Sequence, residues 1–163
     1  QEGGGVRRVE WFVVNAADAA WRGGNGRSAI CDFERGERFP QVGINITVME
    51  PGQLVTLYHE EDAEEDFLVL AGSCLLLIDE RQRALDAWDF VHCAPGTPHA
   101  VVAGTERCVL LQVGARPTTS LRYPVSDLAR SHGVGVDEET ASVDAAYGER
   151  RRGPIEYGGW LAG

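Results

Sequence analysis

Residues 51–72 read PGQLVTLYHEEDAEEDFLVLAG, and residues 94–99 read APGTPH. Both stretches place histidines and carboxylates within or beside short apolar runs of the kind that form strands. Alternate side chains of a strand share a face, so Leu57, His59 and Glu61 are predicted to point the same way. Because the apolar residues of this run belong to that face, we expect His59 and Glu61 to point into the interior.

A second run begins at Glu65, whose alternate neighbour Phe67 is apolar, so Glu65 is expected to face the same interior. The turn at residues 95–98 contains Gly and two prolines and brings His99 to the head of another apolar run. Two imidazoles with one or two carboxylates suit a divalent metal ion. The sequence therefore predicts a metal site whose ligands are His59, Glu61, Glu65 and His99.

This pattern resembles the first motif of the cupin superfamily. In that family the motif reads Gly, five residues, His-x-His, three or four residues, Glu, six residues, Gly. Here Gly52, His59, Glu65 and Gly72 follow in that order, and six residues separate Glu65 from Gly72 as in the family. The spacing in this half of the motif therefore matches.

The chain departs from the family in the other half of the motif. Six residues, rather than five, separate Gly52 from His59, and Glu61 stands at the place of the second histidine. A spacing of five would instead put Tyr58 and Glu60 in the ligand positions and lose the histidine. The period of two in the apolar residues favours His59 and Glu61.

The second cupin motif reads Gly, five residues, Pro-x-Gly, two residues, His. Gly96 and His99 match it, Ala94 replaces the proline with Pro95 directly after it, and Trp88 replaces the first glycine. The resemblance covers residues 40–115. It implies an all-β fold, a single antiparallel β-barrel of the jelly-roll type, with metal ligands carried on its strands.

Many cupins are dioxygenases or isomerases, so the resemblance implies a metal that polarises or oxidises a small oxygen-rich molecule inside the barrel. In that case Glu61 is either a fourth ligand or a base. A nitrogen and oxygen ligand set admits manganese, iron, nickel, copper or zinc. Two alternatives stay open: a barrel that binds a small molecule without catalysis, and a metal-free barrel with a structural role.

Composition limits the remaining choices. A chain of 163 residues with 44% hydrophobic residues suits one compact domain, and a net charge of −10 argues against nucleic acid or an anionic membrane as partner. The apolar runs are too short to cross a bilayer and no leader pattern is recognised, so we expect a cytoplasmic protein. Isolated cysteines are expected to be buried free thiols, as in a reducing compartment; they are Cys31, Cys74, Cys93 and Cys108.

We expect three segments: N-terminal strands and a loop over residues 1–39, the barrel over 40–115, and a short helix with an extended arm over 116–163. In the first segment, alternating apolar residues predict a strand over residues 6–14, and Asn15 is expected to cap a short helical turn.

The last segment is expected to hold a helix over residues 124–130 with Gly133 as a stop. Beyond it, Tyr157, Trp160 and Leu161 predict an arm that packs on the barrel or on a second subunit. We expect a homodimer that binds a small molecule.

Overall fold

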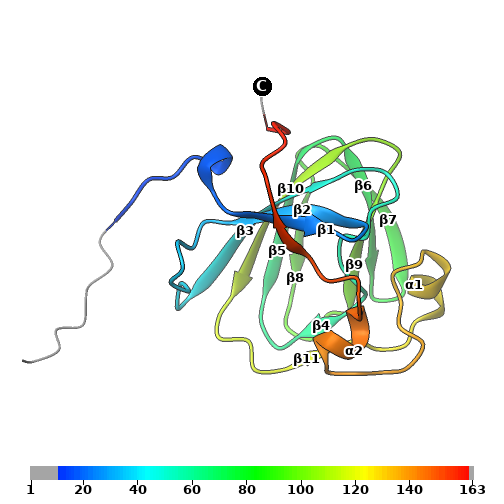
Figure 1. Cartoon of the computed structure of the whole chain (residues 1–163). Coiled ribbons are helices and arrows are strands. Elements are labelled where there is room, and N and C mark those ends of the chain that lie inside the picture. Colours follow the sequence, from blue (N-terminus) through cyan, green and yellow to red (C-terminus); the bar gives the residue numbers. More distant parts are fainter. Residues whose placement is uncertain (1–10, 162–163) are drawn as a thin grey trace, which may run out of the picture.

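The computed structural model describes residues 11–161 and shows an all-β fold, as expected (Figure 1). The strands are β1 (Trp21–Gly24), β2 (Arg27–Asp32), β3 (Val42–Met49), β4 (Glu60–Glu61), β5 (Glu65–Ala71), β6 (Ser73–Ile78), β7 (Arg81–Asp86), β8 (Phe90–Cys93), β9 (His99–Ala103), β10 (Cys108–Ala115), β11 (Leu121–Arg122) and β12 (Gly153–Ile155). The larger antiparallel sheet has the order β12-β1-β2-β3-β10-β5-β8. The smaller has the order β7-β6-β9, and β11 pairs with β4.

The main core lies between the larger and the smaller sheet. It contains inward side chains of both, among them Phe67, Val69 and Leu110 from one and Leu76, Leu85 and Val101 from the other. Burial of this apolar surface is the main force that holds two sheets face to face. All four cysteines are buried and free, as the sequence predicted.

The inward side chains of β3, β10 and β5 change character along the strands. The strand register places them in three rows, which are Thr47, Leu110 and Val69, then Asn45, Gln112 and Phe67, then Gly43, Gly114 and Glu65. Residues on one face of neighbouring strands lie side by side. The apolar core therefore gives way to small and polar side chains toward one end, and the candidate site lies at that end.

In the part of the chain that the structure describes, three short helices lie outside the sheets: η1 (Ala16–Asp18), α1 (Asp127–Ser131) and α2 (Val143–Tyr147). Asn15 caps η1 by accepting a hydrogen bond from the Ala17 N–H at 2.9 Å, as predicted. Helix α1 begins three residues later than predicted, because Ser126 is its N-cap. None of the helices within residues 11–161 is long and apolar enough to span a membrane.

The strand predicted over residues 6–14 is wrong where the structure describes it. Residues 6–10 lie outside the described part of the chain, and residues 11–14 form no strand. Trp11 and Val13 are 89% and 85% exposed, whereas the Phe12 ring packs against Phe39 at 6.1 Å between ring centroids. Exposed and packed side chains do alternate here, but Phe12 contacts the body of the protein while Trp11 and Val13 face solvent.

The C-terminal arm, which we define as residues 150–161, packs on the body of the same chain. Figure 1 shows it in red beside β1, with which β12 pairs in antiparallel fashion. The rings of Tyr157 and Trp160 lie 5.5 and 5.0 Å from the buried Trp21 ring. Arg152 donates hydrogen bonds from Nε to the Ser28 carbonyl (2.8 Å) and from Nη2 to the Ser28 hydroxyl (2.7 Å). Packing on the barrel was one of the two predicted positions of this arm.

Gly72 joins β5 to β6 in a conformation that another residue adopts with difficulty. Its φ is +72°, and a Cβ there would overlap the Arg107 carbonyl oxygen. We expect Gly72→Ala to lower the free energy of unfolding, measured by urea denaturation, by about 3 kcal/mol or more. Gly52→Ala is the matched control, because Gly52 has φ +80° but a Cβ there would meet no atom within 4 Å, and only the backbone penalty of about 1 kcal/mol applies. Equal losses would contradict the role given to Arg107.

Candidate metal centre

His59 and His99 are placed side by side by their own backbones. The His59 N–H donates to the His99 carbonyl at 3.0 Å, and the His99 N–H donates to the His59 carbonyl at 2.9 Å. This reciprocal pair is an isolated antiparallel bridge. The two rings consequently lie 4.7 Å apart between centroids.

The strand predicted for the run that contains Leu57, His59 and Glu61 is much shorter in the structure. Only β4 is regular, because the preceding N–H groups bond to other parts of the chain. Leu57 N–H donates to the Tyr147 hydroxyl (3.0 Å), and Tyr58 N–H donates to the Val134 carbonyl (2.8 Å). His59 and Glu61 nevertheless line the same cavity.

A backbone carbonyl orients each imidazole. His59 Nδ1 lies 2.8 Å from the Leu57 carbonyl oxygen, and His99 Nδ1 lies 2.9 Å from the Thr97 carbonyl oxygen. A carbonyl can only accept, so Nδ1 carries a proton in both rings. In the neutral form of each ring, Nε2 is therefore a free acceptor, which is the form that binds a metal ion.

Glu65, at the start of β5, lies between the two rings. Its Oε2 is 2.9 Å from His99 Nε2 and 3.5 Å from His59 Nε2. The shorter distance is within hydrogen-bonding range, yet the two atoms do not meet in a bonding direction, and both are buried without a hydrogen-bond partner in residues 11–161. Two acceptors this close need a cation between them, either a proton or a metal ion.

The ligand atoms of His59, Glu65 and His99 lie within 4.8 Å of one another. Two ligands of a transition metal, each at about 2.1 Å from the ion, are at most about 4.2 Å apart. The two short separations around Glu65 Oε2 fit such a common centre. The residues present therefore fit a divalent metal with mixed nitrogen and oxygen ligands.

Glu61 stands next to this group without belonging to it. Its Oε1 is 3.9 Å from His59 Nε2, and its Oε2 accepts a hydrogen bond from the Thr118 hydroxyl at 3.3 Å. Burial, and then the charge of Glu65, raise the pKa of Glu61 above its ordinary value. A carboxyl group whose pKa is raised in this way is suited to accepting and returning a proton.

The group holds its own proton when no metal is bound. Burial favours the neutral ring of His99, but interactions with the Cys93 thiol and with the Glu65 carboxylate outweigh it and raise the pKa of His99 to about 9. Burial favours the protonated carboxyl of Glu65, but the two histidines outweigh it and lower the pKa of Glu65 to about 2. At neutral pH the metal-free centre is thus a carboxylate paired with an imidazolium.

Metal binding is therefore expected to release protons. Because the pKa of His99 is raised to about 9, its ring is protonated at pH 7 and must lose that proton to become a ligand. We expect release of about one proton or more per ion at pH 7, and an apparent affinity that falls as pH falls below about 9. Calorimetry in two buffers of different ionisation enthalpy measures the number. His92→Ala is the control, since His92 is exposed and pairs with Asp66. Binding at pH 7 without proton release would contradict this account.

The candidate ligands face a cavity of about 220 Å³ whose lining also includes two tyrosines. Tyr123 is buried, with its ring 6.0 Å from that of His59, and Tyr147 from α2 lies edge-on to it at 5.8 Å. The Arg27 guanidinium lies over the Tyr147 ring at 4.3 Å. Neither tyrosine is predicted from the sequence, because neither lies in the two motifs.

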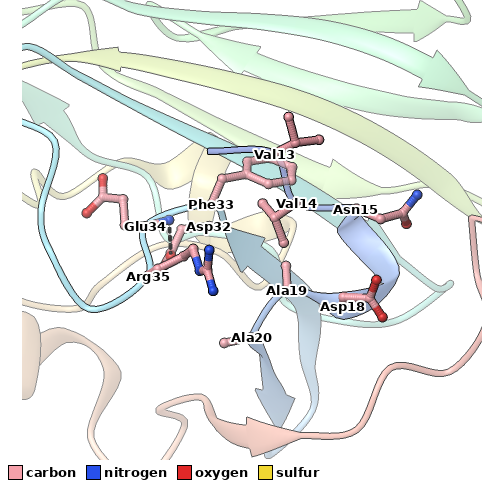
Figure 2. A pocket seen from close by; sticks show the side chains of 10 residues that line it. All are labelled: Val13, Val14, Asn15, Asp18, Ala19, Ala20, Asp32, Phe33, Glu34 and Arg35. Carbon is pink, nitrogen blue, oxygen red and sulfur yellow. Dashed lines mark hydrogen bonds between the residues drawn. The ribbon is translucent and has the colours of Figure 1, made fainter. Parts of the chain in front are cut away.

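A larger cavity, about 440 Å³, lies elsewhere, between residues 13–20 and 32–35 (Figure 2). Its walls mix Val13, Val14 and Phe33 with acidic side chains and Arg35, and contain neither histidine nor cysteine. The hydrogen bond drawn in Figure 2 runs from the Glu34 N–H to Asp32 at 3.0 Å. Size alone does not identify a functional site, and the two histidines and two carboxylates predicted as ligands line the smaller cavity.

Comparison with known proteins agrees with this geometry. Residues 45–114, which include all four predicted ligands, match the family described as cupin domain. No curated protein sequence matches the chain.

Solved structures show the same fold. A polyketide cyclase from Streptomyces resistomycificus aligns with TM-score 0.62 and 18% identity over 72% of this chain and 89% of that one. A sugar phosphate isomerase of the cupin superfamily from Silicibacter pomeroyi aligns with TM-score 0.53 and 21% identity over 70% of each chain. A DMSP lyase from Ruegeria pomeroyi aligns with TM-score 0.53 and 22% identity over 63% of this chain. The aligned part covers only 59% of the lyase.

Proposed function

We propose that this chain, whose residues 45–114 match the cupin domain family, holds a divalent transition metal at His59, Glu65 and His99 and acts there on a small oxygen-rich molecule. The observation that supports the proposal is the buried, unpartnered pair formed by Glu65 Oε2 and His99 Nε2. Buried polar atoms are rarely left without a partner, so a cation belongs between them: a proton in the metal-free centre, and a metal ion when one is bound.

The surroundings of the three ligands favour a reactive centre over a structural one. Structural metal sites are closed by protein ligands, whereas three protein ligands leave coordination positions open. Here the group faces a cavity of about 220 Å³ that contains Thr56, Gln112 and Tyr123 beside apolar walls. A small molecule with several oxygen atoms finds both hydrogen-bond partners and space there.

Glu61 supports proton transfer as the chemistry. When bound, a divalent metal would act as a Lewis acid that polarises an oxygen of the substrate. Glu61 would then take a proton from a carbon next to the polarised group and return it to a different carbon of the same molecule, while the Thr118 hydroxyl holds its carboxylate in place. This assignment favours isomerase-type chemistry over a dioxygenase. Binding of a small molecule without conversion is the alternative, and loss of turnover in Glu61→Gln with unchanged binding separates the two.

Elemental analysis of the purified, unchelated protein tests the proposal. We expect close to one transition metal ion per chain in the wild type, and its loss in His59→Ala, because one of only three ligands is removed. His92→Ala is the matched control and should keep its metal, since His92 is exposed on β8. Absence of metal from every variant, even after reconstitution, would contradict the proposal. The identity of the metal would direct the choice of substrates to screen.

A further inference from the structure

The cavity at the candidate metal centre adjoins a second cavity of about 380 Å³ at the same end of the sheets. Six residues line both cavities: Asn45, Glu61, Glu65, Phe67, Gln112 and Leu121. A molecule bound at the centre can therefore extend into the second space, which we call the outer cavity.

The outer cavity carries positive charge that the inner one lacks. Arg38 and Arg116 line it, whereas no arginine lines the inner cavity. Arg38 is exposed at the surface, and Arg116 is mostly buried, with 19% of its side chain exposed. The two cavities thus differ in the chemical group that each would accept.

Arg116 presents a free edge of its guanidinium group. Its Nη1 donates to Glu34 Oε1 (2.5 Å) and to the Phe39 carbonyl (2.8 Å), which fixes the group in one position. Its Nε and Nη2 make no hydrogen bond within residues 11–161. Two parallel N–H donors on a fixed guanidinium match the two oxygens of a carboxylate or phosphate.

Two glycines make the space for this edge. Gly43 on β3 pairs with Gly114 on β10, and a Cβ at Gly43 would lie 2.6 Å from Arg116 Nη2. At Gly114 a Cβ would meet no atom within 4 Å, and φ is not positive, so neither packing nor the backbone requires glycine there. The missing side chain keeps the outer cavity open.

The same row of the sheet sets the reach of a ligand. Glu65 pairs with Gly114, which pairs with Gly43, so the backbones of Glu65 and Gly43 are two strand spacings apart, about 10 Å. The Arg116 guanidinium lies against Gly43, at the far end of that row. A small molecule that reaches from the metal ligands to Arg116 spans this gap.

We propose that the outer cavity binds an anionic group, carboxylate or phosphate, of the molecule whose oxygen reaches the candidate metal centre. The proposal rests on the proposed function only for its metal-bound end; the binding of the anion by Arg116 and Arg38 stands on the outer cavity alone. Glu61 and Glu65 also line this cavity and repel an anion, so the anion binds more tightly once a metal ion offsets their charge.

Titration calorimetry with inorganic phosphate and with acetate tests the proposal on metal-free and zinc-loaded protein. We expect the wild type to bind at least one anion, and Arg116→Gln to weaken that binding about tenfold or more through loss of a charged bidentate partner. Arg38→Gln should also weaken anion binding, and it leaves the ion pair between Arg116 and Glu34 intact. Gly114→Val should weaken anion binding as well, because its side chain fills the outer cavity without changing the charge. Arg83→Gln, on the exposed face of β7, is the control. The preferred anion distinguishes the two substrate classes.

The outcomes separate this proposal from the metal site. Anion binding that appears only with zinc and is unaffected by all three outer-cavity variants would mean that the anion binds the metal itself, and would overturn the proposal. Absence of anion binding in both forms would also overturn it. Anion binding that the three variants weaken in a protein that takes up no metal would support the outer cavity while the proposed metal site fails.

Discussion

Glu65→Gln is expected to weaken metal binding about a thousandfold. Glu65 is the only carboxylate of the three grouped ligands, and it lies within 3.5 Å of Nε2 of both histidines. Removing one partner of a buried, charge-paired group typically loses about 4 kcal/mol, and each 1.4 kcal/mol is a tenfold change in affinity. Competition with a chelating fluorophore measures the affinity directly.

Glu61→Gln is the matched control, because it makes the same chemical change 3.9 Å from His59 Nε2 but outside the ligand group. We expect its metal affinity to stay within about tenfold of the wild type, the range of changes outside the ligand shell. Turnover, by contrast, should be lost, since the amide cannot accept the proton. If Glu61→Gln weakens metal binding as much as Glu65→Gln does, Glu61 is a ligand and not a base.

Strand period and turn chemistry locate three of the four predicted ligands in one group, while their role as metal ligands stays a prediction. His59, Glu65 and His99 come from separate parts of the chain, yet strand period and turn chemistry predicted that they share an interior. The turn glycines also have physical reasons, since Gly72 and Gly96 both have positive φ. These features depend on local geometry, which a sequence encodes directly.

One departure from the cupin motifs concerns a residue whose backbone is left-handed in the structure. At Trp88, which replaces the first glycine of the second motif, the backbone keeps the left-handed conformation with φ +75°, and the side chain is 73% exposed. Trp88 therefore has the left-handed backbone that glycine adopts most readily, and its N–H donates to the Val69 carbonyl at 2.8 Å. A residue type at one position is thus a weaker guide than the backbone path around it.

Other parts could not be predicted because they depend on contacts between distant segments. Tyr123 and Tyr147 reach the cavity through a bridge to Thr140 and through α2, and no periodic pattern marks either. The strand expected around Leu57 is shortened because the N–H groups of Leu57 and Tyr58 bond to Tyr147 and to the Val134 carbonyl, which are distant in the sequence. Tertiary hydrogen bonds override local strand propensity at such places.

Deletion of residues 150–163 is expected to lower the free energy of unfolding by about 5 kcal/mol or more. It removes the pairing of β12 with β1 and exposes the buried Trp21, against which Tyr157 and Trp160 pack. Truncating one buried aromatic side chain alone typically loses about 3–5 kcal/mol, and a domain has only about 5–15 kcal/mol in total. Urea denaturation followed by tryptophan fluorescence measures the change.

The arm deletion should also disturb the candidate site. The Arg150 carbonyl accepts a hydrogen bond from Arg27 Nη1 at 2.9 Å, and Arg27 holds the Tyr147 ring that lines the metal cavity. Trp160→Ala tests packing separately and should lose about 3 kcal/mol, while Glu156→Ala, exposed in the same arm, should lose almost nothing. Because the arm packs on its own chain, oligomer mass by light scattering should not change in Trp160→Ala. A truncated protein that unfolds at the same urea concentration as the full chain would remove the arm from both roles.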